Sequence, residues 1–156
     1  MTVTLRQPEA DEYAAWKAAD YSGYVEEIVA SGSMSREAAE EKGRREDAEL
    51  LPDGWATSGQ LIFRVDVDGQ SVGWLWLALQ SPRAEAGVGF IYDITIDEAL
   101  RGRGYGRTAM QLAEDEARRH GLHALALNVF GQNAIARALY SSLGYAETSV
   151  QMRKEL

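Results

Sequence analysis

The stretch Ile96–Met110, IDEALRGRGYGRTAM, decides how the rest of the chain is organised. An apolar strand ends there, three arginines and three glycines fall within residues 101–107, and a helical pattern begins. Glycine allows positive φ and close approach of a ligand to the backbone, and the first turn of a helix exposes unpaired N–H groups. The alternative is a tight turn whose arginines are simply solvated, but such a turn does not require three glycines and three arginines together. The cluster as a whole favours a phosphate-binding loop.

Composition narrows the class of protein. The chain has 156 residues, a net charge of −8, no cysteine and two histidines, His120 and His123. The length predicts one domain spanning residues 1–156. No apolar run is long enough to span a bilayer, and the first residues do not resemble a signal peptide, so we expect a cytoplasmic protein that binds no membrane. The acidic balance argues against nucleic-acid binding, and we expect no metal site.

Working outward from residues 96–110, apolar periodicity predicts alternating strands and helices. Asp68-Gly69 is typical of a β-hairpin turn, and VGWLWLAL is typical of a strand buried on both faces. Glycine closes the last two helices. The predicted strands are 2–6, 61–67, 71–79, 87–96 and 124–129, with a final strand or two in 145–156; the predicted helices are 10–30, 35–50, 104–120 and 133–143. This order predicts a mixed α/β fold whose sheet is covered by helices, with a right-handed parallel crossover from 87 to 129.

Two other phosphate motifs fit poorly. Residues 104–109, GYGRTA, match G-x-G-x-x-A, but a dinucleotide-binding unit also needs an acid at the end of the next strand. That strand, ALALNVF, ends near Asn128 and contains no acid, and no G-x-x-x-x-G-K-[ST] motif is present. A nucleotide-binding protein is therefore the weaker interpretation of the glycine loop.

Two motifs resemble one known superfamily, the GCN5-related N-acetyltransferases (GNAT). RGRGYG resembles its R/Q-x-x-G-x-G/A signature, with Arg101, Gly104 and Gly106 on the signature positions. Residues 128–145, NVFGQNAIARALYSSLGY, resemble its second pattern, N-x-x-A-x-x-x-Y-x-x-x-G-[FY]. The matching residues there are Asn133, Ala136, Tyr140, Gly144 and Tyr145. The order of elements also resembles the GNAT order over nearly the whole chain.

The resemblance implies a single GNAT domain with a mixed sheet of about six or seven strands and about four helices. It implies that strand 87–96 carries a bulge and splays from the parallel strand 124–129. The family binds acetyl-coenzyme A, whose pantetheine arm fills the splayed gap like an added strand. The implied cofactor-binding residues are Ile94, Thr95, Ile96, Arg101, Gly102, Arg103, Gly104, Tyr105, Gly106, Arg107, Asn133 and Tyr140.

Two polar residues of the second motif have a structural and a functional interpretation. Asparagine favours the N-cap of a helix, so Asn133 either caps the last helix, bonds the cofactor as the resemblance implies, or does both. Tyr140 lies seven residues later on the same helical face. Its spacing fits a core aromatic, whereas the resemblance implies a hydrogen-bond donor to the departing thiolate, which is a general-acid role.

Asp93 is the candidate general base. Amine transfer needs a neutral amine, and most aliphatic amines are protonated at neutral pH, so a base or a water relay is useful. Asp93 interrupts an apolar strand just before the cofactor contacts that the resemblance implies. Hydrogen bonding to a neighbouring strand, or attraction of a cationic substrate, are equally open. Three other acids, Glu85, Asp97 and Glu98, are expected to be solvated.

The resemblance therefore implies an acyl-CoA-dependent N-acetyltransferase that moves an acetyl group from acetyl-CoA to an amine by direct attack. The acceptor would be a small-molecule or peptide amine, and Tyr21, Tyr24 and Trp55 are candidates to line its side. The acidic balance suits a cationic acceptor. A coenzyme A-binding sensor or interaction module without catalysis remains the alternative, and the chain is expected to be a monomer or a homodimer.

Overall fold

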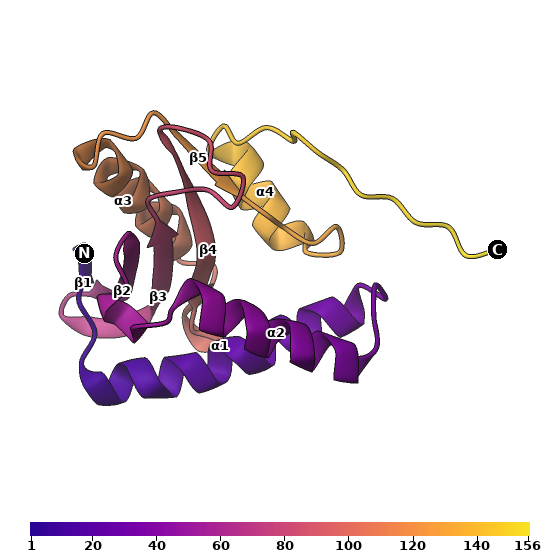
Figure 1. The fold of residues 1–156 in the computed structure, drawn as a ribbon. Helices are drawn as coiled ribbons and strands as arrows, with labels where there is room; N and C mark the ends of the chain where they lie inside the picture. Colours follow the sequence, from indigo (N-terminus) through magenta and orange to yellow (C-terminus); the bar gives the residue numbers. More distant parts are fainter.

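A computed structural model describes the backbone of residues 1–156 and all side chains except those of residues 20–22. Figure 1 shows the order of the elements along the chain. They are β1 (Val3–Arg6), α1 (Ala10–Ala30), α2 (Arg36–Leu50), β2 (Gln60–Val67), β3 (Gln70–Ala78), β4 (Val88–Ile96), α3 (Tyr105–Arg119), β5 (Ala124–Leu127) and α4 (Ala134–Ser142), with short 3-10 turns at Gly54–Ala56 and Glu98–Leu100. The predicted elements up to α4 are confirmed to within one or two residues at each end.

The sheet is mixed, and its strands lie side by side in chain order, from β1 to β5. The first four strands are antiparallel neighbours, and β4 pairs with β5 in parallel. The predicted hairpin turn between β2 and β3 is confirmed, because Asp68 and Gly69 both have positive φ, 50° and 81°. That combination gives the turn whose twist matches the flanking strands. The mixed α/β class predicted from the sequence is correct.

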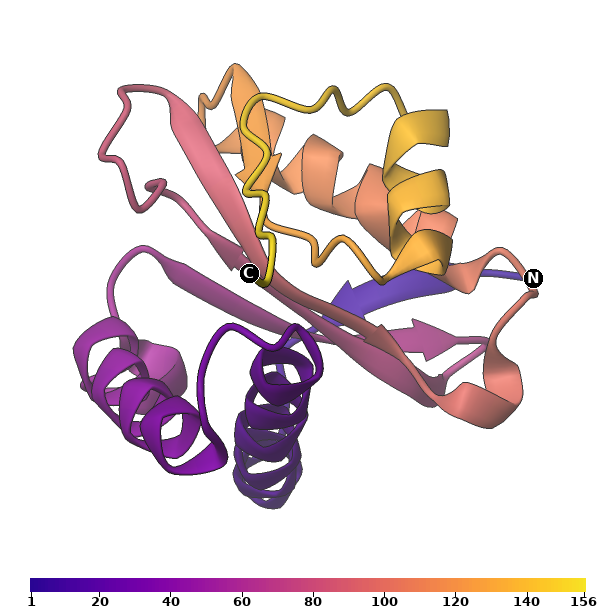
Figure 2. The same ribbon diagram turned by 90° about the vertical axis from the view of Figure 1, so that its right-hand side faces the viewer.

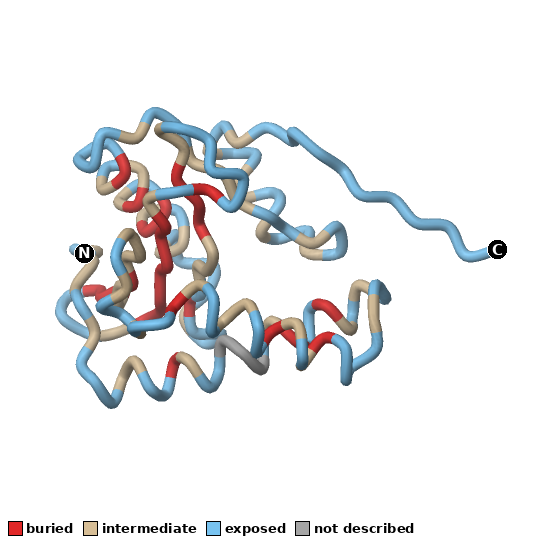
Figure 3. The backbone as a smooth tube through the Cα atoms, in the orientation of Figure 1, coloured by how far each residue is buried: buried red, intermediate tan, exposed pale blue. Residues whose placement is uncertain are grey.

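Helices cover both faces of the sheet, as Figure 2 shows: α3 and α4 lie on one face, α1 and α2 on the other. β3 supplies buried side chains to both. Leu75 and Leu77 pack with Met110 of α3 in a cluster that we call the α3-side core. Trp74 and Trp76 belong to the second cluster, which also contains Trp16, Leu51 and Ile62, with Tyr13, Leu50 and Tyr92 against it. We call this second set the aromatic cluster. Figure 3 shows the buried residues concentrated along the central strands.

A bulge interrupts the pairing of β3 with β4. Trp76 pairs with Asp93 and Leu77 pairs with Ile91, so Tyr92 is an extra residue in β4. An extra residue re-aims the side chains beside it. Tyr92 packs on the aromatic cluster, and Asp93 accepts a hydrogen bond from α1 on that same face. The bulge explains why the apolar alternation of this strand breaks at Ile91.

β4 and β5 separate beyond the bulge. Their pairing runs from Val88–Ala124 to Ile91–Leu127, where β5 ends, whereas β4 continues to Ile96. The predicted splay between these parallel strands is confirmed, although β5 is two residues shorter than expected. The last five residues of β4 therefore have a strand neighbour on the β3 side only.

The predicted strand or strands in residues 145–156 are absent, so the sheet has five strands instead of six or seven. After α4 the segment continues as an extended tail without secondary structure (Figure 1), and near its end Arg153 donates to the carbonyl oxygen of Gly32. Residues 146–156 are all exposed, as Figure 3 shows. A strand exists only with a partner edge, and this segment pairs with none of the strands that the structure describes.

Candidate active site

The glycine loop leads directly into α3 with the backbone geometry expected of an anion site. Gly102 and Gly104 have φ values of 76° and 84°, a left-handed conformation that favours glycine. The first α3 hydrogen bond runs from Thr108 N–H to the carbonyl oxygen of Gly104, at 3.1 Å. The N–H groups of residues 105–107 thus precede the regular bonding of the helix. They form a short row of backbone donors with the positive end of the helix dipole behind them.

The three arginines of this loop have different surroundings. Arg101 donates its Nε hydrogen to the carbonyl oxygen of Ile96, at 2.9 Å, and so fixes the loop to the end of β4. Arg107 donates an Nη2 hydrogen to Ser142 Oγ at 2.5 Å and so joins α3 to α4. Arg103 is exposed and has no side-chain partner among the residues that the structure describes. Arg103 is therefore the cation of the loop that is available to an anion.

Gly106 lies where β4, α3 and α4 meet. A Cβ atom at this position would lie 3.6 Å from Leu139 Cδ2 of α4 and 3.8 Å from Ile96 Cγ1 of β4. Both are ordinary contacts, so a methyl group fits there, while a branched side chain would enter the space between β4 and α4. Ile94 and Ile96 pack against the α3-side core beside this space. The glycine loop and the free end of β4 are thus brought together.

The second motif lies on α4. Asn133 is the N-cap of that helix, and its Oδ1 accepts the N–H of Ala136 at 3.1 Å. The structural role foreseen for Asn133 is confirmed, and its amide NH₂ group stays available. Tyr140 is half-buried against the α3-side core, with its ring edge-on to Tyr145 at 6.0 Å between centroids. Its hydroxyl makes no hydrogen bond to any residue whose side chain or backbone is described.

Burial raises the pKa of Tyr140 to about 12, and the negative charges of Asp93 and Glu27 add to this effect. The phenol is therefore protonated at neutral pH. The same interaction shows that Tyr140 of α4, Asp93 of β4 and Glu27 of α1 lie within electrostatic reach of one another. Beyond Ile91 no strand lies beside β4 on the β5 side, and we call this side of residues 92–96 the gap.

Asp93 is half-buried and held by two donors. Trp16 Nε1 donates to its Oδ2 at 3.2 Å, and Thr95 Oγ1 donates to its Oδ1 at 2.8 Å. Burial raises the pKa of Asp93 above its ordinary value, while the two hydrogen bonds and the charge of Lys17 act in the opposite direction. Its partners are Trp16 of α1 and Thr95 of β4 itself, so the alternative of a side-chain hydrogen bond to a neighbouring strand is wrong.

Three residues around Asp93 could not be predicted from local sequence patterns. Trp16, Lys17 and Glu27 all lie on α1, at least 66 residues before it in the chain. The Lys17 ammonium lies 5.3 Å and 5.5 Å from the ring centroids of Trp16 and Trp76 and pairs with Asp47 of α2. Trp16 and Glu27 are eleven residues apart, which puts them on one face of a helix. Burial and the charge of Asp93 raise the pKa of Glu27.

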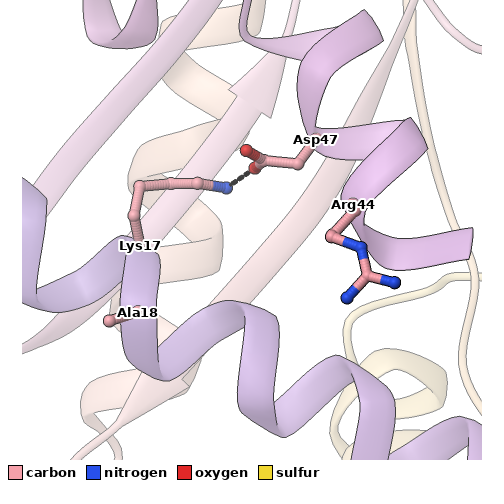
Figure 4. Close-up of a pocket in the computed structure, with 4 residues that line it drawn as sticks. All are labelled: Lys17, Ala18, Arg44 and Asp47. Carbon is pink, nitrogen blue, oxygen red and sulfur yellow. Dashed lines mark ion pairs between the residues drawn. The ribbon is translucent and has the colours of Figure 1, made fainter. Parts of the chain in front are cut away.

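A pocket of about 390 Å³ opens between α1 and α2. Figure 4 shows Lys17 reaching across it to Asp47, with Ala18 and Arg44 completing the lining. Because Lys17 and Asp47 are paired with each other, the pocket is crossed by an ion pair. The gap beside β4 is therefore the better candidate for the reacting centre.

The structure supports an acceptor-lining position for few of the residues that were expected to have one. Tyr21 lies outside the described side chains. The hydroxyl of Tyr24 is held by α2: it donates to Glu46 Oε2 at 2.6 Å and accepts from Lys42 Nζ at 2.7 Å. Trp55 packs edge-on against Tyr13 near the start of α1, with 41% of its surface exposed. Three carboxylates expected to be solvated are exposed: Glu85, Asp97 and Glu98.

Among the described residues, no group of three His, Cys, Asp or Glu side chains is arranged to hold a metal ion. In that same part of the chain, no helix is both long and apolar enough to cross a membrane.

Known proteins resemble this chain in sequence and in fold. The model of the acetyltransferase (GNAT) family matches residues 23–145. The uncharacterised N-acetyltransferase YdgE of Bacillus subtilis (strain 168) is 33% identical over 100% of this chain and 99% of its own length. The crystal structure of the uncharacterised N-acetyltransferase YycN from Bacillus subtilis superposes with a TM-score of 0.91 at 31% identity, covering 99% of each chain.

A more distant structure shares the fold. AAC(6')-Iy, solved with the bisubstrate analogue CoA-S-monomethyl-acetylneamine, superposes with a TM-score of 0.61 at 17% identity and covers 100% of both chains. The family model covers most of the chain, and the similarity to YdgE and YycN extends over the whole chain. This protein belongs to the acetyltransferase (GNAT) family.

Proposed function

We propose that the protein transfers an acetyl group from acetyl-CoA to the amine of a small molecule or peptide. The observation that carries this proposal is the free segment of β4 beyond Ile91. This segment contains Asp93 and leads to the row of N–H donors at the start of α3, and the Tyr140 hydroxyl of α4 is within electrostatic reach of Asp93. Membership of the GNAT family supports the reaction class.

The site fits acetyl-CoA in two respects. A pyrophosphate suits the N–H groups of residues 105–107, with Arg103 as a nearby cation. The pantetheine arm carries amides that suit those backbone groups of residues 94–96 that point away from β3, and the amide NH₂ group of Asn133 is available at the start of α4. When bound there, acetyl-CoA supplies an activated acetyl thioester.

Asp93 acts on the acceptor nitrogen. An ammonium group has no lone pair, so the acceptor must lose a proton before or during attack. The Asp93 carboxylate takes this proton, directly or through water, and its pKa, raised by burial, makes it a better base than a solvated aspartate. Glu27 adds negative charge on the same side. The acceptor we propose is therefore a cationic amine.

Tyr140 acts on the departing sulfur. Its hydroxyl is protonated and has no partner among the described residues, so it can donate a hydrogen bond to a ligand in the gap. With a pKa of about 12, the phenol is a weaker acid than a thiol, whose ordinary pKa is about 8.5. Tyr140 therefore stabilises developing charge on sulfur by hydrogen bonding, and full proton transfer is not required.

Turnover of acetyl-CoA tests the proposal. The wild-type protein should release free thiol from acetyl-CoA in the presence of at least one member of a panel of cationic primary amines. Acetyl-CoA alone should raise the melting temperature, because a ligand that binds only the folded state stabilises it. Stabilisation without thiol release for any amine would favour the non-catalytic module. No stabilisation and no binding by calorimetry would remove both interpretations.

Gly106 provides a matched pair of variants for the binding loop. Gly106→Ala adds one methyl group at ordinary contact distance from Leu139 and Ile96, so acetyl-CoA should still raise the melting temperature. Gly106→Val extends into the gap and should abolish that rise. Gly104 is a less clean position, because any side chain at its φ of 84° is strained. Equal binding by both Gly106 variants would place the cofactor elsewhere.

Tyr140→Phe should lower kcat by about 100-fold, the low end of the range for general acids, because a thiolate is already a fairly stable leaving group. The acetyl-CoA dissociation constant should change little. Steady-state kinetics and calorimetry measure the two quantities. Tyr145→Phe is the matched control, since its ring packs edge-on against Tyr140, and it should keep kcat. An unchanged kcat in Tyr140→Phe, with chemistry limiting, would return Tyr140 to a packing role.

Asp93→Asn should lower kcat/KM for the amine and remove the acidic limb of its pH profile. Because the base form is required and burial raises the pKa of Asp93, activity of the wild type should rise with pH above the ordinary range of an aspartate. If Asp93 only attracts a cationic acceptor, KM should rise at constant kcat.

The acetyl-CoA dissociation constant distinguishes these cases from misplacement of the residue. It should stay constant in Asp93→Asn, and a tenfold weakening with an intact fold would put Asp93 on the cofactor side. A lower melting temperature with unchanged kinetics would make the bonds to Trp16 and Thr95 its whole role. Asp97→Asn, an exposed carboxylate after the same strand, is the control and should alter neither constant.

A further inference from the structure

Lys17 of α1 is a largely buried cation beside the aromatic cluster. Its side chain is 18% exposed, and its ammonium lies 5.3 Å from the ring centroid of Trp16 and 5.5 Å from that of Trp76. An ammonium group is attracted to the face of an aromatic ring, and the attraction grows as water is excluded. Because a lysine is seldom buried without a partner, its position here needs a cause.

The two rings that lie against Lys17 also border Asp93. Trp16 Nε1 donates to Asp93 Oδ2 at 3.2 Å, and Trp76 is the residue of β3 that pairs with Asp93 across the sheet. Residues paired in this way lie on the same face of a sheet. The positive charge of Lys17 accordingly lowers the pKa of Asp93, in opposition to burial.

Charged and titratable groups approach Asp93 and the aromatic cluster from several elements. Arg64 of β2 is engaged elsewhere, because it stacks on Trp74 at 4.5 Å from the ring centroid and pairs with Glu12 at 3.5 Å. Among the described groups, Lys17 is the cation whose charge acts on Asp93. The surrounding groups are Lys17 and Glu27 of α1, Glu46 and Asp47 of α2, Arg64 of β2, Tyr92 of β4 and Tyr140 of α4.

Asp47 of α2 holds Lys17 in this position. The two side chains pair across the pocket between α1 and α2, as Figure 4 shows. A lysine side chain is flexible, so an ammonium without a fixed partner could turn toward solvent. Asp47 thus restricts the ammonium of Lys17 to the region beside Trp16 and Trp76.

We propose that Lys17, held by Asp47, is a positioning residue that keeps Asp93 in the carboxylate form required for proton abstraction. This inference rests on the proposed function, in which Asp93 is the base. Burial favours the neutral acid, which cannot accept the proton of an ammonium acceptor. Lys17 opposes that effect, so the pH at which activity begins is set in part from the pocket between α1 and α2.

Carbon-13 NMR of the aspartate carboxyl groups measures the ionisation of Asp93 in the protein without ligand, and Asp93→Asn identifies its signal. Lys17→Met keeps an apolar stem and removes the charge, so the titration midpoint of Asp93 should rise by about one pH unit. Lys17→Arg keeps the charge and should restore the wild-type midpoint. Arg44→Gln is the matched control. It removes a positive charge from the same pocket, where Arg44 pairs with Glu41, and should leave the midpoint unchanged.

A second variant covers the case in which Lys17→Met does not fold, since that change leaves Asp47 without its partner. Lys17→Met combined with Asp47→Asn removes both charges, and the Asp93 midpoint should rise in this variant as well. Circular dichroism shows which variants are folded. A wild-type midpoint in either folded variant would overturn the proposal and make the pair a link between α1 and α2 only.

The pH profile of kcat/KM for the amine separates this inference from the proposed function. The acidic limb of Lys17→Met should move up with the carboxyl midpoint. One pH unit below the wild-type midpoint, kcat/KM should then be about tenfold lower, with an unchanged plateau at higher pH. If the Asp93 midpoint rises and the limb does not move, Asp93 is not the base, and the proposed function of that residue is wrong. If neither moves, only the inference about Lys17 is wrong.

Discussion

The unequal lengths of two parallel strands are the constraint on which the site depends. β5 stops at Leu127, while β4 continues to Ile96, so part of the β4 backbone faces a gap where the next strand would lie. Backbone N–H and C=O groups are costly to bury without partners, which makes such a gap a natural place for a ligand with amides. The bulge at Tyr92 acts on the same segment, because it directs Asp93 to the aromatic face. One short strand and one extra residue thus create both the opening and the polar group beside it.

Charge is divided between the two sides of this gap. The start of α3 offers backbone N–H groups and Arg103, which suit an anion. Asp93 and Glu27 lie toward α1, where they raise the pKa of Tyr140. An acidic protein can in this way keep a phosphate-binding surface, because the positive character comes largely from the backbone. The same division separates the proposed cofactor side from the proposed acceptor side, and it favours a cationic acceptor over an anionic one.

Local sequence patterns predicted the helices and strands well. The features that could not be predicted depend on contacts between residues far apart in the chain. Ala10–Ala30 of α1 and the Asp68-Gly69 turn follow from short-range patterns, and so does the glycine loop. The bond from Trp16 to Asp93 joins residues 77 positions apart, and no local pattern couples α1 to the bulge. The strand expected in residues 145–156 failed for the same reason. Its alternation is present, but a strand also needs a partner edge, and alternation does not say which edge that is.

The central claim is that acetyl-CoA occupies the gap along the free segment of β4. Hydrogen–deuterium exchange with and without acetyl-CoA measures this most directly, because it reports on the backbone amides themselves. The account predicts slower exchange at the amides of residues 94–96 and 105–107 when acetyl-CoA is present, with little change in β1 and β2. Protection confined to other segments, with these two unchanged at saturating acetyl-CoA, would contradict it.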